Sequence, residues 1–441
     1  MKKVCMVGTG YVGLVTGAGL AKLGHDVTCV DVDAEKIKIL QNGGIPFFEK
    51  DLLQLVHDGL YAGNLHFTTS LEEGIKETPY IFVAVATPQS SAGEPNLSQL
   101  FKVADSLAAL TTDPKMVIIK STVPIGSIND FNVRLKQGSA KGKNFKLICC
   151  PEFLAEGSAV HDFFFSTRTI FGAPDEETAR EVGRLFEGVS GPRIYTSIET
   201  AQLIKYASNS FLASRVAYIN EISRICELFG VDVRHVEQGM LLDPRFGNSY
   251  LNASIGYGGA CLPKDLAALI YTARSSGYEP LLCDAIAEQN KQQIQHTIDQ
   301  ICQMVGEGEK VTIFGISFKA GTSDVRNSLT IKIIQGLIDR FRIVVATDPE
   351  ALEYASSLPE ISAAILIKNP WEAANQSDAQ VFLTSWPEYK LLNLERLYKV
   401  VNKARIFDGP GIFDPQVVER IGFKYIGIGR VKANKMMVID C

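Results

Sequence analysis

Short apolar runs alternate with helix-period segments in the amino-terminal part of the chain, and this alternation restricts the fold more than any other feature. A helix-period segment at 11–23 follows the first apolar run and ends before Gly24. The runs typical of strands are residues 4–7, 25–31, 80–84, 116–120 and 146–150. Because these strands are nearly continuous in apolar residues and are separated by helices, they predict a parallel sheet that is covered on both faces.

The pattern changes at about residue 199. Residues 199–229 keep apolar side chains at helical spacing up to Gly230, which predicts one long helix, and 284–305 form a further helical segment. The alternation of strands and helices restarts near Lys310. Its strand-like runs are 311–314, 342–346, 379–384 and 404–408, and its first helix-period segment is 329–341.

Length and composition fit a chain of several domains. The 441 residues are enough for two or three domains, and 46% hydrophobic with 21% charged residues is ordinary for a globular protein. We therefore expect an α/β chain in which two Rossmann-like doubly wound domains are joined by a central helical domain with one long helix. The expected boundaries are 1–198, 199–305 and 306–441.

Charge and residue usage exclude several classes of function. A formal net charge of -5 argues for neither nucleic-acid nor membrane-surface binding, and no apolar run approaches the ~20 residues that span a bilayer. The nine cysteines are odd in number and form no C-x-x-C pair, which is typical of the reducing cytoplasm. The six histidines have no metal-binding spacing, so we expect no metal.

The glycine-rich run G-T-G-Y-V-G at 8–13 lies between the first strand and the first helix. Gly8 permits the tight turn, Gly10 lets the backbone approach a pyrophosphate, and Gly13 allows close packing of helix on strand. The helix N-terminus then offers free N–H groups and the positive end of its dipole to the phosphates. The run therefore predicts dinucleotide binding.

Asp31 ends the second predicted strand, at the spacing expected for the acid that binds a ribose diol. Its carboxylate would repel a 2′-phosphate, so NAD is favoured over NADP. Lys36 lies further along and either reaches the adenosine side of the cofactor or is a solvated helix lysine.

A cysteine lies in the run G-Y-G-G-A-C-L-P-K-D at 256–265. The glycines give a ligand access to Cys261, and Lys264 is close enough in sequence to favour its thiolate. A thiolate can hold an aldehyde covalently for a second oxidation, which predicts a dehydrogenase that continues to the acid. Asp265 precedes an apolar helical run and is either part of the site or a helix N-cap.

Lys205 and Asn209 are four residues apart on the predicted long helix and share one of its faces. Pointing into a cleft, they would donate hydrogen bonds to an oxyanion. The alternative is two polar residues on a solvated face, and spacing alone favours that alternative.

Three loops follow predicted strands and so lie where open α/β sheets bind ligands. They are S-T-V-P at 121–124, P-E-F-L-A-E-G at 151–157 and the loop at 315–328. Glu152 and Glu156 act as, or orient, a general base, or else are surface-loop acids. Lys319 and Arg326 suit a second nucleotide or phosphate; for Arg326 the alternative is an ion pair with Asp324 at a capped helix.

These motifs together resemble the UDP-glucose 6-dehydrogenase family, within a wider group that also oxidises GDP-mannose and UDP-N-acetyl sugars. The resemblance covers about residues 1–430. It rests on G-x-G-Y-V-G, S-T-V-P, P-E-F-L-x-E-G, K-Y-x-x-N, G-Y-G-G-x-C-x-P-K-D and F-K-x-x-T-x-D-x-R, all in order.

The resemblance implies an NAD-binding domain, a central domain that carries the cysteine and dimerises, and a UDP-sugar-binding domain. It implies oxidation of a UDP-glucose C6 hydroxyl to the carboxylate with two NAD, through a Cys261 thiohemiacetal and thioester. The product, UDP-glucuronate, would feed polysaccharide biosynthesis. The same chemistry on GDP-mannose or another hexose nucleotide is the alternative, whereas a two-electron dehydrogenase or a silent nucleotide sensor would have no use for Cys261.

The resemblance also implies roles for particular residues. The catalytic positions are Cys261, Lys205, Asn209, Asp265, Thr122 and Glu152. The cofactor positions are Gly8, Gly10, Tyr11, Val12, Gly13, Asp31, Lys36, Thr87, Thr122, Glu156, Lys264 and Arg326. The substrate positions are Glu152, Phe153, Leu154, Ala155, Glu156, Lys205, Asn209, Arg245, Tyr250, Leu251, Asn252, Ala253, Ser254, Gly258 and Lys319.

Arg245 matches an arginine that the family donates across a subunit boundary, which implies a homodimer or higher homo-oligomer built on the long helix. The chain departs from the family pattern at four positions, which are Ala155, Ala253, Ile255 and Pro410. Pro-Lys-Asp after Cys261 resembles the UDP-glucose and GDP-mannose branches more than the N-acetyl-sugar branch.

Overall fold

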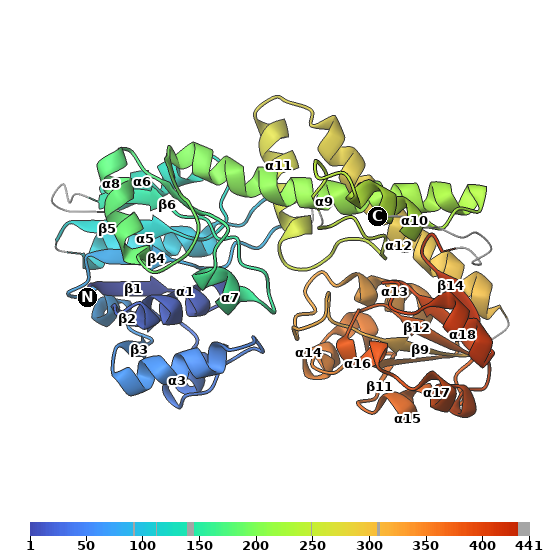
Figure 1. Cartoon of the computed structure of the whole chain (residues 1–441). Helices are drawn as coiled ribbons and strands as arrows, with labels where there is room; N and C mark the ends of the chain where they lie inside the picture. Colours follow the sequence, from blue (N-terminus) through green and yellow to red (C-terminus); the bar gives the residue numbers. More distant parts are fainter. Residues whose placement is uncertain (91–92, 112, 139–144, 248, 307–308, 431–441) are drawn as a thin grey trace. The chain divides into compact units, whose positions relative to one another are not determined.

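The computed structural model describes residues 1–90, 93–111, 113–138, 145–247, 249–306 and 309–430 (Figure 1). The chain forms two compact units. Unit 1 is Met1–Ser208 together with Ala267–Tyr278, and unit 2 is Asn209–Leu266 together with Glu279–Cys441. Each unit contains one sheet, and each is described by itself below.

The sheet of unit 1 has eight strands in the order β3-β2-β1-β4-β5-β6-β7-β8. The strands are β1 (Lys3–Val7), β2 (Asp26–Val30), β3 (Leu65–Thr68), β4 (Tyr80–Val83), β5 (Lys115–Ile119), β6 (Phe145–Cys149), β7 (Thr169–Gly172) and β8 (Arg193–Thr196). All neighbours pair in parallel except β6 and β7, which pair antiparallel at Cys149 and Gly172.

Helices cover both faces of this sheet. They are α1 (Tyr11–Lys22), α2 (Ala34–Gln41), α3 (Leu52–Ala62), α4 (Leu71–Ile75), α5 (Ser98–Leu110), α6 (Ser127–Gln137), α7 (Ala159–Phe164) and α8 (Glu176–Gly183), with the 3₁₀ turn η1 (Arg184–Phe186). Successive residues of a strand point to opposite faces. In β1, Val4 and Met6 accordingly join one buried cluster with α1 and α3, while Cys5 and Val7 join another with α5 and α6. This is a doubly wound sheet.

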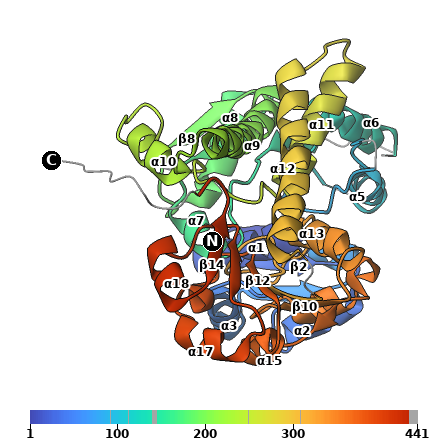
Figure 2. The same cartoon turned by 90° about the vertical axis from the view of Figure 1, so that its right-hand side faces the viewer.

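One helix, α9 (Ile198–Phe229), supplies residues to both units, because Ser208 ends the first segment of unit 1 and Asn209 begins unit 2. Three more helices follow it: α10 (Val233–Leu241), α11 (Leu262–Ser275) and α12 (Leu281–Val305). In unit 2, α12 lies beside α13 (Leu329–Ile338) (Figure 2). Ile298 of α12 and Ile334 of α13 belong to the same buried apolar cluster.

The sheet of unit 2 has six strands, all parallel, in the order β11-β10-β9-β12-β13-β14. The strands are β9 (Lys310–Phe314), β10 (Ile343–Thr347), β11 (Ile365–Leu366), β12 (Ala379–Phe382), β13 (Arg405–Asp408) and β14 (Lys424–Gly427). The remaining helices are α14 (Leu352–Ser356), α15 (Pro370–Ala374), α16 (Pro387–Lys390), α17 (Leu394–Val400) and α18 (Pro415–Ile421), with the 3₁₀ turn η2 (Pro359–Ile361).

The predicted fold class is confirmed: two parallel α/β sheets and a helical region between them in sequence. Two features of the sheets differ from the sequence prediction. The antiparallel β6–β7 pair was not expected, and the strands β3, β7, β8, β11 and β14 were not predicted. Apart from the buried β7, these strands are only partly buried, and β11 is only two residues long. Such strands lack the continuous apolar run by which a central parallel strand is recognised.

Candidate active site

The glycine-rich turn between β1 and α1 has the geometry of a dinucleotide-binding loop. Gly8 has a φ of +98°, and a Cβ there would lie 2.5 Å from the Ala84 carbonyl oxygen. A Cβ on Gly13 would lie 1.9 Å from the Gly8 carbonyl oxygen, so helix and turn touch at this point. A Cβ on Gly10, in contrast, would meet no described atom within 4 Å. The protein therefore leaves open the space over Gly10 that a pyrophosphate needs.

The N-terminus of α1 lies next to this open space. Gly10 is its N-cap residue and offers no side-chain cap, so the N–H groups of the first turn remain available to a phosphate. Tyr11 and Val12 are half-buried in that turn. The residues present thus fit the nucleotide they were predicted to bind.

Asp31 follows β2, and its carboxylate is held against the glycine-rich turn. Its Oδ2 accepts hydrogen bonds from the backbone N–H and the hydroxyl of Thr9, both at 2.8 Å, and its Oδ1 accepts one from the Asp33 N–H at 3.1 Å. Burial raises the pKa of Asp31, but these hydrogen bonds and the Lys36 ammonium at 3.5 Å outweigh burial, so the pKa lies below its usual value. Thr9 was not predicted, because only the glycines of that run carry a sequence signal.

The loops after β4 and β5 are tied together at the carboxyl edge of the sheet. The Thr87 hydroxyl donates to the Thr122 carbonyl oxygen at 2.9 Å, and the Ser121 hydroxyl donates to the Val85 carbonyl oxygen at 2.7 Å. Two predicted cofactor positions, Thr87 and Thr122, therefore lie side by side.

Glu152 is buried, with 7% of its surface exposed, and is not a surface-loop acid. Its Oε1 lies 2.9 Å from the Lys205 ammonium, which also donates to the Glu152 carbonyl oxygen at 2.6 Å, and its Oε2 accepts from the Leu154 N–H at 2.6 Å. Burial raises the pKa of Glu152, but the Lys205 charge and these hydrogen bonds reverse the effect, so the pKa is lowered overall.

A second buried carboxylate fixes the far end of the same loop. Glu49, 3% exposed, accepts from the N–H groups of Gly157 at 2.6 Å and Ala159 at 2.8 Å, and the Gly157 N–H also lies 2.8 Å from the Tyr11 hydroxyl. The half-buried Glu156 lies in the loop that Glu49 anchors. Glu49 was missed because no motif surrounds it and its partners are more than a hundred residues away.

The residues between Glu152 and Glu156 are packed rather than open. The Arg168 guanidinium stacks 3.9 Å from the Phe153 ring centroid, and the Ala155 N–H donates to Asp162 at 2.9 Å. Leu154 packs against the buried apolar cluster to which α1 and α3 contribute. The backbone of this loop is therefore held in place by its own unit.

Lys205 and Asn209 lie on successive turns of α9 and are buried, with 4% and 6% of their surface exposed. The alternative of a solvated helix face is therefore wrong. Lys205 bonds to Glu152 within unit 1, while the Asn209 amide donates to the Asp265 carboxylate at 2.5 Å within unit 2. Spacing could not reveal this burial, because it depends on partners more than fifty residues away.

Asp265 is 1% exposed and lies in the first turn of α11, which begins at Leu262, so the prediction of an N-cap is wrong. The Lys264 ammonium lies 2.6 Å from its second oxygen. Cys261 holds the position before the helix instead, and its carbonyl oxygen accepts from the Asp265 N–H at 2.9 Å. Of the eight described cysteines Cys261 alone is exposed, whereas burial raises the pKa of the Cys5 thiol to about 12. Cys261 is thus an exposed cysteine at the start of α11.

The glycines of the cysteine run serve close packing within unit 2. A Cβ on Gly258 would lie 2.7 Å from the Asn327 carbonyl oxygen, and one on Gly259 would lie 2.6 Å from the Phe318 ring. Lys319, which follows Phe318 in the loop at 315–328, is half-buried. The predicted phosphate loop and the cysteine loop are therefore brought together.

The segment 250–254 is pinned by side chains that the sequence did not single out. The Asn220 carboxamide oxygen accepts from the Ser254 N–H at 2.8 Å, and the Gln293 amide donates to the Ser254 carbonyl oxygen at 2.9 Å. Leu251 and Ala253 point inward, whereas Tyr250, with a φ of 61°, and Asn252 are exposed.

Two predicted arginines make ion pairs with acids two residues away. Arg326 lies 2.5 Å from Asp324, which is the alternative considered for that position, and Arg245 lies 2.5 Å from Asp243. Both guanidinium groups are mostly exposed. Each guanidinium has five N–H donors, so the ion pair leaves other donors that can meet a ligand or another chain.

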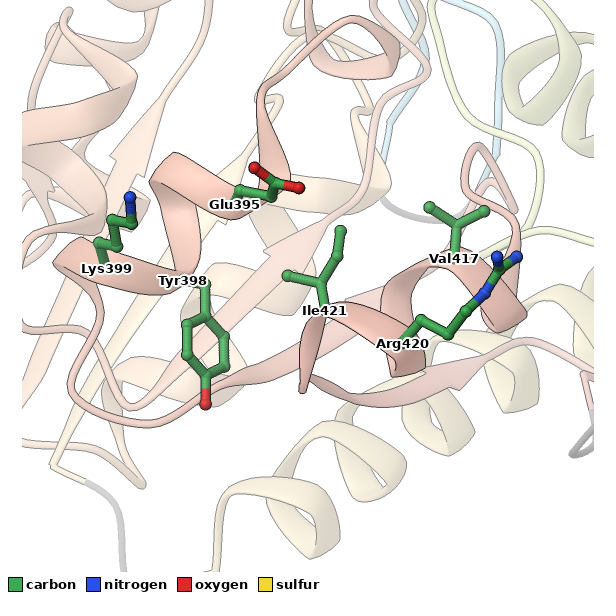
Figure 3. A pocket seen from close by; sticks show the side chains of 6 residues that line it. All are labelled: Glu395, Tyr398, Lys399, Val417, Arg420 and Ile421. Carbon is green, nitrogen blue, oxygen red and sulfur yellow. The ribbon is translucent and has the colours of Figure 1, made fainter.

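A cavity of about 500 Å³ between α17 and α18 contains none of the predicted site residues (Figure 3). Among the residues that the structure describes, no group of His, Cys, Asp and Glu side chains is arranged to hold a metal ion. No helix within those residues is long and apolar enough to cross a membrane.

The turn between β1 and α1, with Asp31 held against it, defines a dinucleotide-binding α/β domain, the class to which nicotinamide-dependent dehydrogenases belong. Three domain models of one family match the chain: the NAD binding domain at residues 2–190, the central domain at 199–292 and the UDP binding domain at 312–415. The chain belongs to the UDP-glucose/GDP-mannose dehydrogenase family, and its cofactor is NAD. The resemblance and the cofactor prediction are confirmed.

Relatives of known name match over nearly the whole chain. UDP-glucose 6-dehydrogenase TuaD of Bacillus subtilis (strain 168) is 36% identical over 433 residues, covering 98% of this chain and 94% of the relative. UDP-glucose 6-dehydrogenase YwqF of the same strain is 37% identical over 430 residues, covering 97% of each. The solved structure of a UDP-glucose dehydrogenase from the archaeon Pyrobaculum islandicum matches with a TM-score of 0.91 at 30% identity, covering 98% of each chain.

Proposed function

We propose that this enzyme oxidises UDP-glucose at C6 to UDP-glucuronate. One UDP-glucose, two NAD⁺ and one water give UDP-glucuronate, two NADH and three protons. The observation that carries the proposal is Cys261, an exposed thiol at the start of α11 beside the buried Asn209–Asp265 pair. The names of the relatives support the choice of UDP-glucose.

The NAD site that we propose consists mostly of residues of unit 1. Gly10 and the first turn of α1 would hold the pyrophosphate, and Asp31 would bind the adenosine ribose. Thr87, Thr122 and Glu156 would line the nicotinamide end, with Lys36, Lys264 and Arg326 as further contacts. When bound, NAD accepts a hydride from the carbon that is oxidised.

Cys261 would carry the covalent steps. Its thiolate adds to the aldehyde carbon and forms a C–S bond, and the carbonyl oxygen takes a proton to give a thiohemiacetal. Loss of a hydride and a proton converts this species to a thioester. Water then adds, the C–S bond breaks, and the thiolate returns as the carboxylate leaves.

Lys205 and Asn209 would donate hydrogen bonds to the oxyanions of these steps. Glu152 would hold the Lys205 ammonium in place, since both Glu152 oxygens already accept hydrogen bonds. Asp265 would hold the Asn209 amide in the same way. Thr122, Glu152 and Asp265 are also our candidates for proton and water management.

The sugar nucleotide would bind to unit 2 residues 250–254, Gly258 and Lys319, and to Glu152–Glu156 and Arg245. GDP-mannose or another hexose nucleotide is the second candidate substrate, since the family includes such enzymes. The three-domain division, the cytoplasmic location and the role in polysaccharide formation rest on the sequence and stay predictions.

The test is the amount of NADH formed per sugar nucleotide consumed, with UDP-glucose, GDP-mannose and UDP-N-acetylglucosamine in parallel. We expect two NADH per UDP-glucose. One NADH would mean that oxidation stops at the aldehyde, which contradicts the role of Cys261. Turnover of GDP-mannose alone would keep the chemistry and replace the substrate.

We further propose that the enzyme is a homodimer or a higher homo-oligomer built on α9. Phe211, Tyr218 and Ile225 are spaced seven residues apart on α9, so they form one stripe, and they are 62%, 52% and 44% exposed. Such a stripe suits a second copy of the same helix.

Light scattering after size exclusion should give a dimer or larger for wild type and a monomer for Tyr218→Arg. Tyr278→Arg, at an exposed tyrosine outside the stripe, is the control. A monomeric wild type contradicts the proposal.

A further inference from the structure

Arg234, near the start of α10, joins two loops of unit 2. Its Nη1 donates to the Glu237 carboxylate at 2.9 Å and to the Asn252 side-chain oxygen at 3.3 Å. Its Nη2 donates to the Pro410 carbonyl oxygen at 2.9 Å and to the Gly411 carbonyl oxygen at 3.4 Å. One guanidinium therefore connects the segment 250–254 with the loop that follows β13.

The first side of this connection is buried. Glu237 is 2% exposed, and its Oε1 accepts from the Ala253 N–H at 2.6 Å while its Oε2 faces Arg234. Burial of a carboxylate is unfavourable without a cation, so Arg234 stabilises the charge that holds Ala253. Asn252 and Ala253, on either side of one peptide bond, are thus both fixed through Arg234.

The second side is built for a close approach. Gly411 has a φ of +67°, where other residues are strained, and a Cβ there would lie 2.2 Å from the Arg234 Nη2 and displace the guanidinium. The same loop is anchored from behind, because the Asp408 carboxylate accepts from the Ile412 N–H at 3.0 Å and the Phe413 N–H at 2.9 Å. Its carbonyl groups are therefore held in position for the guanidinium.

The two loops also touch directly. A Cβ on Gly409 would lie 2.7 Å from the Ile255 side chain, so Gly409 and Ile255 are in close contact. Apolar packing at Ile255 and the polar connection at Arg234 combine the two loops into one surface. That surface carries residues 250–254, which we propose as part of the sugar-nucleotide site.

We propose that Arg234 is a positioning residue for the nucleotide-sugar substrate, which it serves by holding the segment 250–254 against the loop at 409–411. The inference rests on the proposed function. It assigns Arg234 no role in the chemical steps and none in NAD binding, since the hydrogen bonds of Arg234 go to Glu237, to Asn252 and to the loop at 409–411, none of which is a proposed NAD contact. Removing the Arg234 side chain should therefore weaken binding of the sugar nucleotide and leave unchanged the rate at which the bound substrate reacts.

The experiment compares steady-state kinetics of wild type, Arg234→Met and Arg234→Lys in the full-length enzyme. Arg234→Met loses all four hydrogen bonds, and we expect its KM for the sugar nucleotide to rise about tenfold, with kcat and the KM for NAD within about twofold of wild type. Arg234→Lys keeps the charge beside Glu237 but lacks the planar fork that reaches both loops, so we expect it not to restore the wild-type KM.

Arg430→Gln is the matched control. Arg430 pairs at 3.0 Å with Asp232, which precedes α10. Within the described residues, Arg430 makes no hydrogen bond to the segment 250–254 or to the loop at 409–411. Its KM for the sugar nucleotide should stay within about twofold of wild type. A rise equal to that of Arg234→Met would mean that any disturbance of α10 has the same effect, and the inference would be wrong.

Wild type is first assayed on UDP-glucose, GDP-mannose and UDP-N-acetylglucosamine, and the comparison uses whichever it oxidises, so a wrong substrate and a wrong role for Arg234 give different results. An unchanged KM in Arg234→Met overturns the inference and leaves the proposed function intact. Equal losses for NAD and for the sugar nucleotide overturn it too, as does full rescue by Arg234→Lys. If wild type oxidises none of the three, the proposed function fails, and equilibrium binding of UDP-glucose to the same variants decides the role of Arg234.

Discussion

Replacing Glu152 with Gln should destabilise unit 1 strongly, because it leaves the Lys205 ammonium buried without its anion. The two side chains are 6% and 4% exposed and lie 2.9 Å apart. Glutamine matches the shape of glutamate but has only one acceptor oxygen. The glutamine NH₂ group must therefore point at either the Lys205 ammonium or the Leu154 N–H. Each of these groups is itself a hydrogen-bond donor, so one hydrogen bond is lost in either case.

The magnitude follows from burial. Removing one partner of a buried ion pair costs about 3–5 kcal/mol, whereas replacing both partners often costs little. Glu152→Gln should therefore be more destabilising than the double variant Glu152→Gln, Lys205→Met. For a domain of this size, a loss of ~3 kcal/mol lowers Tm by roughly 6–12 °C. Glu77→Gln is the matched control, because Glu77 pairs with Lys3 at 2.5 Å on the exposed surface and should contribute little.

The assay separates the two units. Both tryptophans of the chain, Trp371 and Trp386, belong to unit 2, so their emission during urea unfolding serves as an internal reference. Amide hydrogen exchange of peptides from β5 and β6 reports the opening of unit 1. Wild-type protection of these peptides in Glu152→Gln, or additive effects of the two substitutions, would refute the reasoning.

The pH dependence has a definite sign. The pKa of Glu152 is lowered in the folded protein, so its contribution to stability is fully present above the unfolded pKa of about 4.3 and is lost as the pH falls through the lower, folded value. Unit 1 of wild type should therefore lose stability below about pH 4 more steeply than Glu152→Gln does.

Three further outcomes are expected. Gly10→Ala should keep the wild-type Tm but weaken NAD binding, because its Cβ meets no described atom of the protein and enters the pyrophosphate space. Gly13→Ala should lower both the Tm and the NAD affinity, because its Cβ would lie 1.9 Å from the Gly8 carbonyl oxygen. Thermal melts measure the Tm of both variants, and calorimetric titration measures their NAD affinity. Wild-type kcat/KM for NADP should be at least ~100-fold below that for NAD, since an ionised Asp31 opposes a 2′-phosphate; comparable values would contradict it. Cys261→Ser should abolish formation of UDP-glucuronate, whereas the control Cys283→Ser, at a partly buried thiol, should retain it. The measurement is the amount of NADH formed per UDP-glucose consumed.

The sequence predicted the central strands and the cysteine loop because their signals are local. An apolar run of four residues, 4–7, marks β1 whatever surrounds it, and glycines around Cys261 mark a close approach. Contacts across the fold leave no such mark. Lys205 on its own helix looks like a solvated residue, and its partner Glu152, which follows β6, is far from it in the sequence. Glu49 carries no motif, yet it fixes the loop that contains Glu156.

The two Rossmann-like sheets place an aspartate at equivalent points, and the difference between these aspartates is also invisible in the sequence. Asp31 follows β2 and Asp348 follows β10, the strand beside the first one in each unit. Asp348 is 1% exposed, and its Oδ2 accepts from the N–H groups of Ile316 and Ser317 and from the Trp386 indole. Its Oδ1 accepts from two further backbone N–H groups at the start of the next loop.

An aspartate binds a ribose diol only if its oxygens are accessible and have acceptor capacity to spare. Asp31 meets this condition at Oδ1, which accepts one hydrogen bond within the described residues, from the Asp33 N–H, on a side chain that is 11% exposed. Asp348 does not, because each of its oxygens already accepts at least two hydrogen bonds inside unit 2. The position that we propose for ribose binding in unit 1 thus holds, in unit 2, an aspartate that stabilises the fold. The same topology therefore yields an NAD-binding sheet and a sheet that must bind its nucleotide by other residues, which agrees with the match of the second sheet to a UDP binding domain.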